Sequence, residues 1–297
     1  MPAISVILPT FNRAGLLRQS VESVFAQTCN DWELVIADDG SNEETRTYLR
    51  TLPASRVRIL WLGHSGNPSR VRNAALAAAR GEFVAFLDSD DLWLPNKLER
   101  QLAAIRANGW CYCLYEHIDA SGARIEPKRP RPRHFPDGQV FESLLKLELA
   151  IPMPTVFAAR SLVTSAGGFD EQQRFGEFHD LCLRLAMNSP VIAVRETLCR
   201  IRTHGDHYSA DRVAAHMSWM RLYEKMAPLA PTAHLRSHCL RMRSVTALNV
   251  AWLQGNSRDH AAVWSTLKKA ARFSWRSPRW WYAALKAIVR PHVLGKR

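Results

Sequence analysis

The first hundred residues alternate between short apolar runs and segments with helical periodicity, and this alternation constrains the fold more than any other feature. The apolar runs predict buried strands, and the segments between them carry apolar residues on one helical face. Strands are expected at 3–8, 32–37, 57–62 and 82–87, and helices at 14–27, 43–52, 68–79 and 96–108. Because strands joined by helices pair in parallel, we predict an α/β protein with a Rossmann-like, mostly parallel sheet flanked by helices.

The regular alternation stops near residue 110. Further strands are expected at 110–117 and 155–158, and further helices at 139–149 and 178–187. From about Ser209 onward the pattern is helical only, with breaks near 228–231, 255 and 278. The sequence therefore predicts one domain over 1–210, divided near residue 110, and a helical C-terminal region over 211–297.

Composition favours a folded chain that stays in the cytoplasm. Of the 297 residues, 47% are hydrophobic, which is enough for a sizeable core. No apolar run approaches the roughly 20 residues that a membrane-spanning helix needs. Residues 1–4 lead directly into a strand and not into a signal peptide. The six cysteines show no CxxC spacing, so we expect reduced core thiols and no zinc site.

The net charge of +13 is concentrated in two stretches. Residues 258–297 contain ten Lys and Arg against one acid, a net +9, and 127–134 contain four Lys and Arg and no acid, a net +4. The rest of the chain is therefore balanced. A basic tail favours contact with an anionic surface, whereas a nucleic-acid-binding domain would carry a basic stripe across its fold.

Acidic residues follow two of the predicted strands. Asp38 and Asp39 end the second strand, and Asp88, Asp90 and Asp91 end the fourth. The carboxyl ends of parallel strands meet at one edge of a sheet, which is where ligands bind in such folds. A cation would relieve the repulsion among these carboxylates, and Mg²⁺ or Mn²⁺ prefers oxygen ligands.

An alternative for the same positions is that they cap the helices that follow, as Asp91 and Ser41 could do.

Two common nucleotide-binding motifs are absent. The first strand is followed by Pro-Thr-Phe-Asn-Arg at 9–13, with neither Gly-x-Gly-x-x-Gly nor Gly-Lys-Ser/Thr. This disfavours a dinucleotide-dependent dehydrogenase and a P-loop enzyme.

Four segments, in this order, resemble a family 2 glycosyltransferase of the GT-A fold. They are SVILPTFNR at 5–13, ELVIADDGS at 33–41, SRVRNAA at 69–75 and GEFVAFLDSDD at 81–91. The resemblance is close over about 3–100 and looser over 101–210. It implies a GT-A domain with a nucleotide-binding half (1–110), an acceptor half (111–210) and a C-terminal helical extension.

The resemblance implies which residues hold the base of a nucleotide, which is usually uracil in this family. Pro9, Thr10 and Phe11 would line the base pocket, and Asp39 would hydrogen-bond the base. Arg72 would reach the same base or the phosphates.

The resemblance also implies which residues hold the rest of the donor. Asp88 would hold the ribose, with Ser89 beside it among the residues that bind the nucleotide sugar, and Asp90 would ligate the metal. Asp38 would shape the turn. Arg13 would either lie near the diphosphate or be an exposed arginine at a helix start.

Family members carry a general base on a helix after the metal-binding strand, in the pattern Glu-Asp, aromatic, Asp-Leu. This chain reads GEFHDLCLR at 176–184, so Phe178 replaces the usual aspartate. Glu177 is the nearest replacement for a base that takes the proton of the acceptor hydroxyl, and Asp180 lies one turn further on the same face. The alternatives are His179 as the base and Asp180 as a structural partner of Arg184.

Two features lie nearer the C-terminus. Family members often carry a histidine that helps to bind metal or diphosphate, and His204 matches its place, although a surface histidine is the alternative. Residues 278–293 combine tryptophans with Lys and Arg at helical spacing. Such a helix can lie on the inner face of a membrane, or its apolar side can pack on its own domain.

The sequence therefore predicts an inverting glycosyltransferase that depends on Mn²⁺ or Mg²⁺. It would move a sugar from a nucleoside diphosphate sugar, UDP-linked, to a glycan or lipid-linked acceptor in polysaccharide biosynthesis. The alternatives are a nucleotidyltransferase and a degenerate homologue that binds a nucleotide or a partner without turnover. No nucleic-acid partner is expected.

Overall fold

The computed structural model describes residues 2–105, 109–126, 135–203, 211–256, 260–274 and 281. The chain forms two compact units. One consists of Met1–Glu171 with Glu177–Gly205, and the other of Gln172–Gly176 with Asp206–Arg297. The predicted boundary at residue 210 lies outside the described residues.

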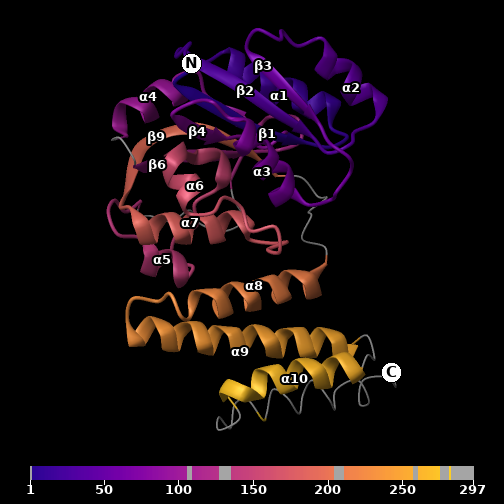
Figure 1. Cartoon of the computed structure of the whole chain (residues 1–297), viewed down its shortest axis with the longest axis vertical. Coiled ribbons are helices and arrows are strands. Elements are labelled where there is room, and N and C mark those ends of the chain that lie inside the picture. Colours follow the sequence, from indigo (N-terminus) through magenta and orange to yellow (C-terminus); the bar gives the residue numbers. More distant parts are fainter. Residues whose placement is uncertain are drawn as a thin grey trace. The chain divides into compact units, whose positions relative to one another are not determined.

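The first four strands and helices alternate as predicted and build one half of the sheet (Figure 1). The strands are β1 (Ile4–Thr10), β2 (Trp32–Asp38), β3 (Val57–Trp61) and β4 (Phe83–Phe86), and the helices are α1 (Ala14–Phe25), α2 (Glu43–Arg50), α3 (Pro68–Ala78) and α4 (Lys97–Ala104). β1 pairs in parallel with both β2 and β4, and β2 pairs in parallel with β3. Each element begins within one residue of its predicted start.

The other half of the sheet contains both strand directions. It is built from β5 (Leu92–Trp93), β6 (Trp110–Ile118), β8 (Val156–Ala159) and β9 (Val191–Arg202), and β7 (Arg124–Ile125) pairs with β6. The order across the sheet is β3-β2-β1-β4-β8-β6-β9-β5. β8 is antiparallel to β4 and to β6, whereas β6 and β9 are parallel. This is the mixed, mostly parallel sheet that was expected.

The long strand β9 is a feature that the sequence analysis does not predict. Arg195 and Glu196 are exposed in the middle of the strand and interrupt its apolar pattern. The pairing of β9 with β6 shifts in register around Leu114. Such an irregularity breaks the period of two on which strand prediction depends.

Two of the remaining helices of the first unit were predicted, α5 (Phe141–Leu145) and α7 (Glu177–Asn188). The 3₁₀ turn η1 (Met153–Thr155) and helix α6 (Arg160–Ser165) were not. α5 is shorter than the predicted 139–149, and Leu147 just beyond it has a φ of 59°, which is incompatible with a continuing right-handed helix. The centre of the core is β1, in which Ile4, Val6 and Ile7 are completely buried.

The second unit is helical, as predicted. Its helices are α8 (Arg212–Met226), α9 (Ala233–Asn256) and α10 (His260–Ser274), and α9 packs on α10 through Ala247, Ala251, Val263 and Leu267. The predicted breaks near 228–231 and 255 are confirmed. Among the described helices, none is long and apolar enough to cross a bilayer. Apart from Trp281, the predicted helix over 278–293 lies outside the described residues.

Candidate active site

The predicted site residues of the first unit gather at the carboxyl edge of β1, β2 and β4. The register pairs Thr10 at the end of β1 with Asp38 at the end of β2, and the loop of Asp88–Asp91 follows β4. Asp38 accepts hydrogen bonds from the backbone N–H of Ser41 (3.2 Å), so its predicted role in shaping the turn is confirmed.

Arg72 on α3 joins two acids that lie far apart in the sequence. Its Nη2 donates to Oδ1 of Asp88 (2.8 Å) and its Nη1 donates to Oε1 of Glu177 at the start of α7 (2.9 Å). Burial acts to lower the pKa of Arg72, but the two carboxylates outweigh it, so the pKa is raised and the guanidinium keeps its charge. Burial raises the pKa of Asp88; Arg72 opposes the shift and Asp90 adds to it.

The position of Arg72 is set by the residues around it on α3. Asn67 caps the helix, because its Oδ1 accepts from the backbone N–H groups of Ser69 and Arg70, and Pro68 occupies the first turn. Asn73 then ties the helix to Phe169, with its Oδ1 accepting from the Phe169 N–H (2.8 Å) and its Nδ2 donating to the Phe169 carbonyl (2.8 Å). Neither asparagine was predicted as a site residue.

Asp90 and Arg13 form an ion pair across the mouth of the site. The Asp90 side chain is only 14% exposed, whereas the Arg13 side chain is 41% exposed and can move into solvent. Arg13 is thus the exposed N-cap residue of α1, as one alternative predicted, and it also pairs with an acid of the predicted donor site. Ser89 is buried between Asp88 and Asp90.

Arg202, at the end of β9, donates hydrogen bonds to the acidic loop of Asp88–Asp91. Its Nε donates to the carbonyl of Asp90 (2.9 Å), and its backbone N–H donates to Oδ1 of Asp91 (2.8 Å). Its other guanidinium nitrogens donate to the carbonyls of Asp119 and Ala120 and to Oε1 of Gln19. Asp91 precedes β5 and not a helix, so the capping alternative for Asp91 is wrong.

The same loop carries an excess of negative charge. Burial raises the pKa of Asp91 well above its ordinary value, and the charges of Asp88 and Asp90 add to the shift. Within the described part of the chain, no group of three or more His, Cys, Asp or Glu side chains is arranged to hold a metal by itself. Mg²⁺ and Mn²⁺ sites with one or two carboxylates are completed by substrate phosphates, so Asp90 fits such a site. His204 lies outside the described residues.

The residues predicted to hold the base lie at the ends of β1 and β2, and Asp39 and Phe11 contact the segment that follows β3. Asp39 is buried, and its carboxylate accepts from the N–H and hydroxyl of Ser65 (both 2.8 Å) and from the N–H of Gly66 (3.0 Å). Phe11 is exposed and stacks on His64 with a centroid separation of 4.2 Å. Pro9 is half-buried and Thr10 is buried.

Two buried polar atoms of the site, Oγ1 of Thr10 and Nε of Arg72, have no hydrogen-bond partner among the described residues. An orphaned buried polar group is costly and is found where a ligand or water completes the site. Both atoms belong to residues predicted to contact the nucleotide.

The two candidate bases on α7 lie in different surroundings. The Glu177 side chain is partly exposed, and only its Oε1 is hydrogen-bonded within the described residues. Asp180 is completely buried, and its Oδ2 accepts from Nε (2.9 Å) and Nη2 (2.6 Å) of Arg184. The structural alternative for Asp180 thus matches its contacts, and Glu177 is the better placed of the two.

The residues between them belong to the core. Phe178 packs against Phe86 and Phe169, so the aromatic side chain that replaces the usual aspartate is part of an apolar cluster. Nε2 of His179 hydrogen-bonds the carbonyl of Leu144 (3.1 Å). Burial lowers the pKa of His179 to about 4, so it is neutral at pH 7. Its hydrogen bond joins α7 to α5.

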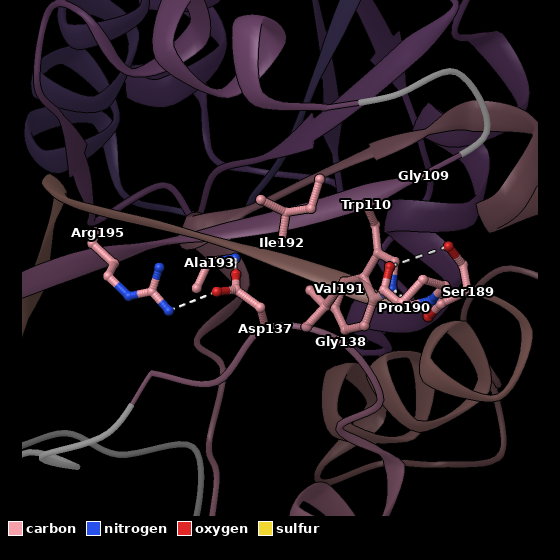
Figure 2. A pocket seen from close by; sticks show the side chains of 10 residues that line it. All are labelled: Gly109, Trp110, Asp137, Gly138, Ser189, Pro190, Val191, Ile192, Ala193 and Arg195. Atoms are coloured by element: carbon pink, nitrogen blue, oxygen red, sulfur yellow. Dashed lines mark hydrogen bonds and ion pairs between the residues drawn. The ribbon is translucent and has the colours of Figure 1, made fainter.

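A separate pocket of about 650 Å³ lies at the amino ends of β6 and β9 (Figure 2). Trp110 and Pro190 line it, and an ion pair between Asp137 and Arg195 (2.6 Å) lies across it. β6 and β9 run parallel to β4, so this pocket is at the opposite edge of the sheet from the carboxyl ends. It contains none of the predicted site residues.

The comparison with known sequences agrees with this geometry. A sequence model described as "Glycosyl transferase family 2" matches residues 5–161. An uncharacterized glycosyltransferase of Rickettsia bellii is 32% identical over 208 residues, which are 69% of this chain and 29% of the relative. A UDP-Glc:alpha-D-GlcNAc-diphosphoundecaprenol beta-1,3-glucosyltransferase of Escherichia coli is 38% identical over 118 residues, which are 39% of this chain and 47% of the relative. The matches span less than half of either relative.

Solved structures share the fold. S. aureus TarS 1-349 in complex with UDP-GlcNAc has a TM-score of 0.72 at 17% identity, covering 97% of this chain and 89% of that chain. Mannosyltransferase PcManGT from Pyrobaculum calidifontis, in complex with GDP-Man and Mn²⁺, has a TM-score of 0.60 at 18% identity, covering 98% of this chain and 87% of that one. The predicted GT-A fold is thereby confirmed. Because the family model covers more than half of its residues, the chain belongs to glycosyl transferase family 2.

Proposed function

We propose that this chain transfers a sugar from a UDP-sugar to an acceptor hydroxyl, with inversion at the anomeric carbon, in glycan or polysaccharide biosynthesis. The observation that carries the proposal is the bridge made by Arg72 between Asp88 and Glu177. This bridge brings a proposed ribose ligand and a proposed base to one guanidinium. The UDP-GlcNAc complex of TarS supports the choice of a nucleotide sugar as donor.

In this proposal the donor is held by residues at the three strand ends. Pro9, Thr10, Phe11 and Asp39 hold the base, and Asp88 with Ser89 holds the ribose. Arg72 is charged and buried, so it can orient the diphosphate side of the donor without losing its two acidic partners. The hydroxyl of Thr10 would gain the hydrogen bond that it lacks within the described residues.

Glu177 is the proposed general base. Its Oε1 is held by Arg72 and its Oε2 makes no hydrogen bond within the described residues, so Oε2 can accept the proton of an acceptor hydroxyl. A single carboxylate is sufficient for direct displacement, because no covalent intermediate has to form. Asp180 then stabilises α7 through Arg184.

Asp90 is the proposed ligand for Mn²⁺ or Mg²⁺, with His204 as a second ligand from outside the described residues. The cation would supply positive charge to the departing diphosphate. Arg13 already provides positive charge at Asp90, and its exposed side chain can turn from Asp90 towards the phosphates.

The acceptor is proposed to be a glycan or a lipid-linked sugar at the cytoplasmic face of a membrane. The E. coli relative acts on a diphosphoundecaprenol-linked sugar, according to its name. The basic C-terminal residues would favour the anionic lipids of that face.

A thermal-shift panel tests the donor. We would measure the melting temperature with UDP, GDP and dTDP and with their sugars, each with and without Mn²⁺. A ligand present at about 100 times its Kd stabilises the native state by about 2.7 kcal/mol, which corresponds to a rise of several degrees. We expect the largest rise with UDP or a UDP-sugar, and a further rise with Mn²⁺.

Two variants with matched chemistry define the outcome. Asp90→Asn should lose the increment that depends on Mn²⁺, whereas Asp137→Asn, in the pocket at the opposite sheet edge, should respond like the wild type. A chain that no nucleotide stabilises would contradict the proposal. Nucleotide binding without consumption of any nucleotide sugar would instead favour the degenerate homologue.

A further inference from the structure

His64 contacts the two groups that are proposed to hold the nucleobase. Its imidazole ring stacks on Phe11 with centroids 4.2 Å apart and an interplanar angle of 19°. Its Nδ1 lies 3.1 Å from Oδ2 of Asp39 and 3.0 Å from the Asp39 carbonyl. A flat ring stacked on an aromatic side chain, with a nitrogen directed at a carboxylate, makes the contacts that a base would make there.

Most of the acceptor capacity of the Asp39 carboxylate is already used. A carboxylate offers about four lone-pair positions. Ser65 donates to Oδ1 through both its N–H and its hydroxyl, and Gly66 donates to Oδ2 through its N–H. Nδ1 of His64 hydrogen-bonds the Asp39 carbonyl (3.0 Å), and the same nitrogen lies 3.1 Å from Oδ2, beside its remaining acceptor position. The N–H of a base can therefore reach that position on Oδ2 only if the imidazole ring of His64 moves.

Among these donors, His64 is the one that can leave most easily. Two of the others are backbone N–H groups of a turn that leads into the Asn67 cap of α3, so they cannot move without disturbing the helix. The His64 side chain is 53% exposed and needs only a rotation about its own bonds to reach solvent.

The backbone of His64 is nevertheless held close to the site. Gly40 has a φ of 78°, and a Cβ at this position would lie 2.8 Å from the backbone nitrogen of His64. Only glycine allows both this conformation and this approach. The backbone of His64 therefore stays beside the site, and only its imidazole ring moves when the side chain rotates.

We propose that His64 is a specificity-determining residue that competes with the nucleobase for Phe11 and Asp39 and must rotate away when the nucleotide binds. The proposal rests on the proposed function, because it assigns Phe11 and Asp39 to the base. Every nucleotide must then displace the stack of His64 on Phe11 and the contact of His64 with Asp39. Only a base whose own contacts with Phe11 and Asp39 are stronger than those of His64 binds tightly.

Isothermal titration of UDP and uridine into the full chain tests this competition. His64→Ala should lower the Kd of both ligands by a similar factor of about 10, since it removes one aromatic stack and one hydrogen bond that the base otherwise has to replace. His64→Phe keeps a ring on Phe11 but has no nitrogen for Asp39, so its Kd should lie between that of the wild type and that of His64→Ala. His117→Ala, which removes a histidine that contacts Tyr115, should bind like the wild type.

The titrations distinguish failure of the His64 proposal from failure of the proposed function. An unchanged or weaker affinity of His64→Ala for UDP, with a wild-type melting temperature, overturns the competition while leaving the proposed function intact. Binding of UDP by His64→Ala and not by the wild type supports it. If neither protein binds UDP, GDP or dTDP at millimolar concentration, both the competition and the proposed function fail.

Discussion

At the scale of single residues, burial separates side chains that look equivalent in the sequence. Glu177 and Asp180 lie one turn apart on α7. Within the described residues, one carboxylate oxygen of Glu177 has no hydrogen-bond partner. The Asp180 side chain, in contrast, is completely buried and paired with Arg184. A base has to reach its substrate, whereas a completely buried carboxylate paired with Arg184 supports the fold. Solvent access therefore points to Glu177.

Glu177→Gln should reduce the rate of sugar transfer by about 10²–10⁴, which is the usual contribution of a general base. Glutamine can still accept a hydrogen bond from Arg72, so the Kd for UDP should change little. Steady-state rates with the UDP-sugar found in the thermal-shift panel would measure this. The control is Glu43→Gln, which changes an exposed glutamate paired with Arg50.

Asp180→Asn should act on stability. Removing one charge of a buried pair leaves Arg184 uncompensated, and such changes cost about 3–5 kcal/mol. Urea denaturation should therefore show a large loss of stability, with transfer per folded molecule retained. A stable Asp180→Asn protein that has no activity would contradict this and identify Asp180, not Glu177, as the base.

At the scale of elements, β9 supports the site although it carries none of the predicted donor-binding residues. Its last residue, Arg202, donates to the carbonyl of Asp90 and to the carboxylate of Asp91. Two elements therefore hold the acidic loop in place: α3 contacts it through Arg72, and β9 contacts it through Arg202. Groups that orient metal ligands in this way affect metal affinity without touching the metal.

Arg202→Lys should weaken the binding of Mn²⁺ in the presence of UDP by about 10–100-fold. Lysine keeps the charge but cannot span the several acceptors that a planar guanidinium reaches at once. Titration of Mn²⁺ by calorimetry would measure the change. Arg200→Lys, on the same strand and paired with Glu116, should bind Mn²⁺ like the wild type.

A second consequence at this scale is a dependence of stability on pH at the contact between α5 and α7. The pKa of His179 is about 4 in the folded chain and near 6.5 when unfolded, so the unfolded chain binds more protons between these values. Stability from this group is therefore complete above pH 6.5 and declines as the pH falls towards 4, by up to about 3 kcal/mol.

His179→Gln tests this dependence, because glutamine can donate to the Leu144 carbonyl but does not titrate. Urea denaturation between pH 7 and pH 4 should show a shallower decline for the variant than for the wild type. Parallel declines would mean that other groups cause the loss of stability in acid.

At the scale of the whole molecule, the charge is distributed unevenly. The excess of Lys and Arg lies in 127–134 and 258–297. In the described part of the helical unit, Trp252 and Trp264 are exposed, and tryptophans are common where a protein meets the bilayer interface. Basic segments and exposed tryptophans are the composition expected for the proposed contact with anionic lipids.

The full chain should float with vesicles that contain anionic phospholipid and should remain unbound with neutral vesicles. Deletion of 276–297 removes six Lys and Arg, and each contributes about 1 kcal/mol near an anionic surface, so binding should be lost. Raising the salt concentration should have the same effect through screening. Flotation that persists after the deletion would contradict a role for this segment.

Much of the fold could be predicted from the sequence, because strands and helices leave local periodicities in the chain. The acids of the site could also be located, since they directly follow strands whose carboxyl ends share one edge. The strand β9 was missed where two charged residues and a register shift interrupt its pattern. With β9, Arg202 was missed as well.

The first four strands and helices, the family and the positions of the acidic turns could be read from the amino-acid sequence, because they depend on residues that are near one another along the chain. How the site residues pair with one another becomes visible only in the folded chain. Arg72 and Glu177 are 105 positions apart, Arg202 and Asp91 are 111 apart, and His64 and Phe11 come from different strand ends. Such contacts are set by the packing of the whole sheet, which leaves the Glu177 carboxylate partly exposed and buries that of Asp180 completely.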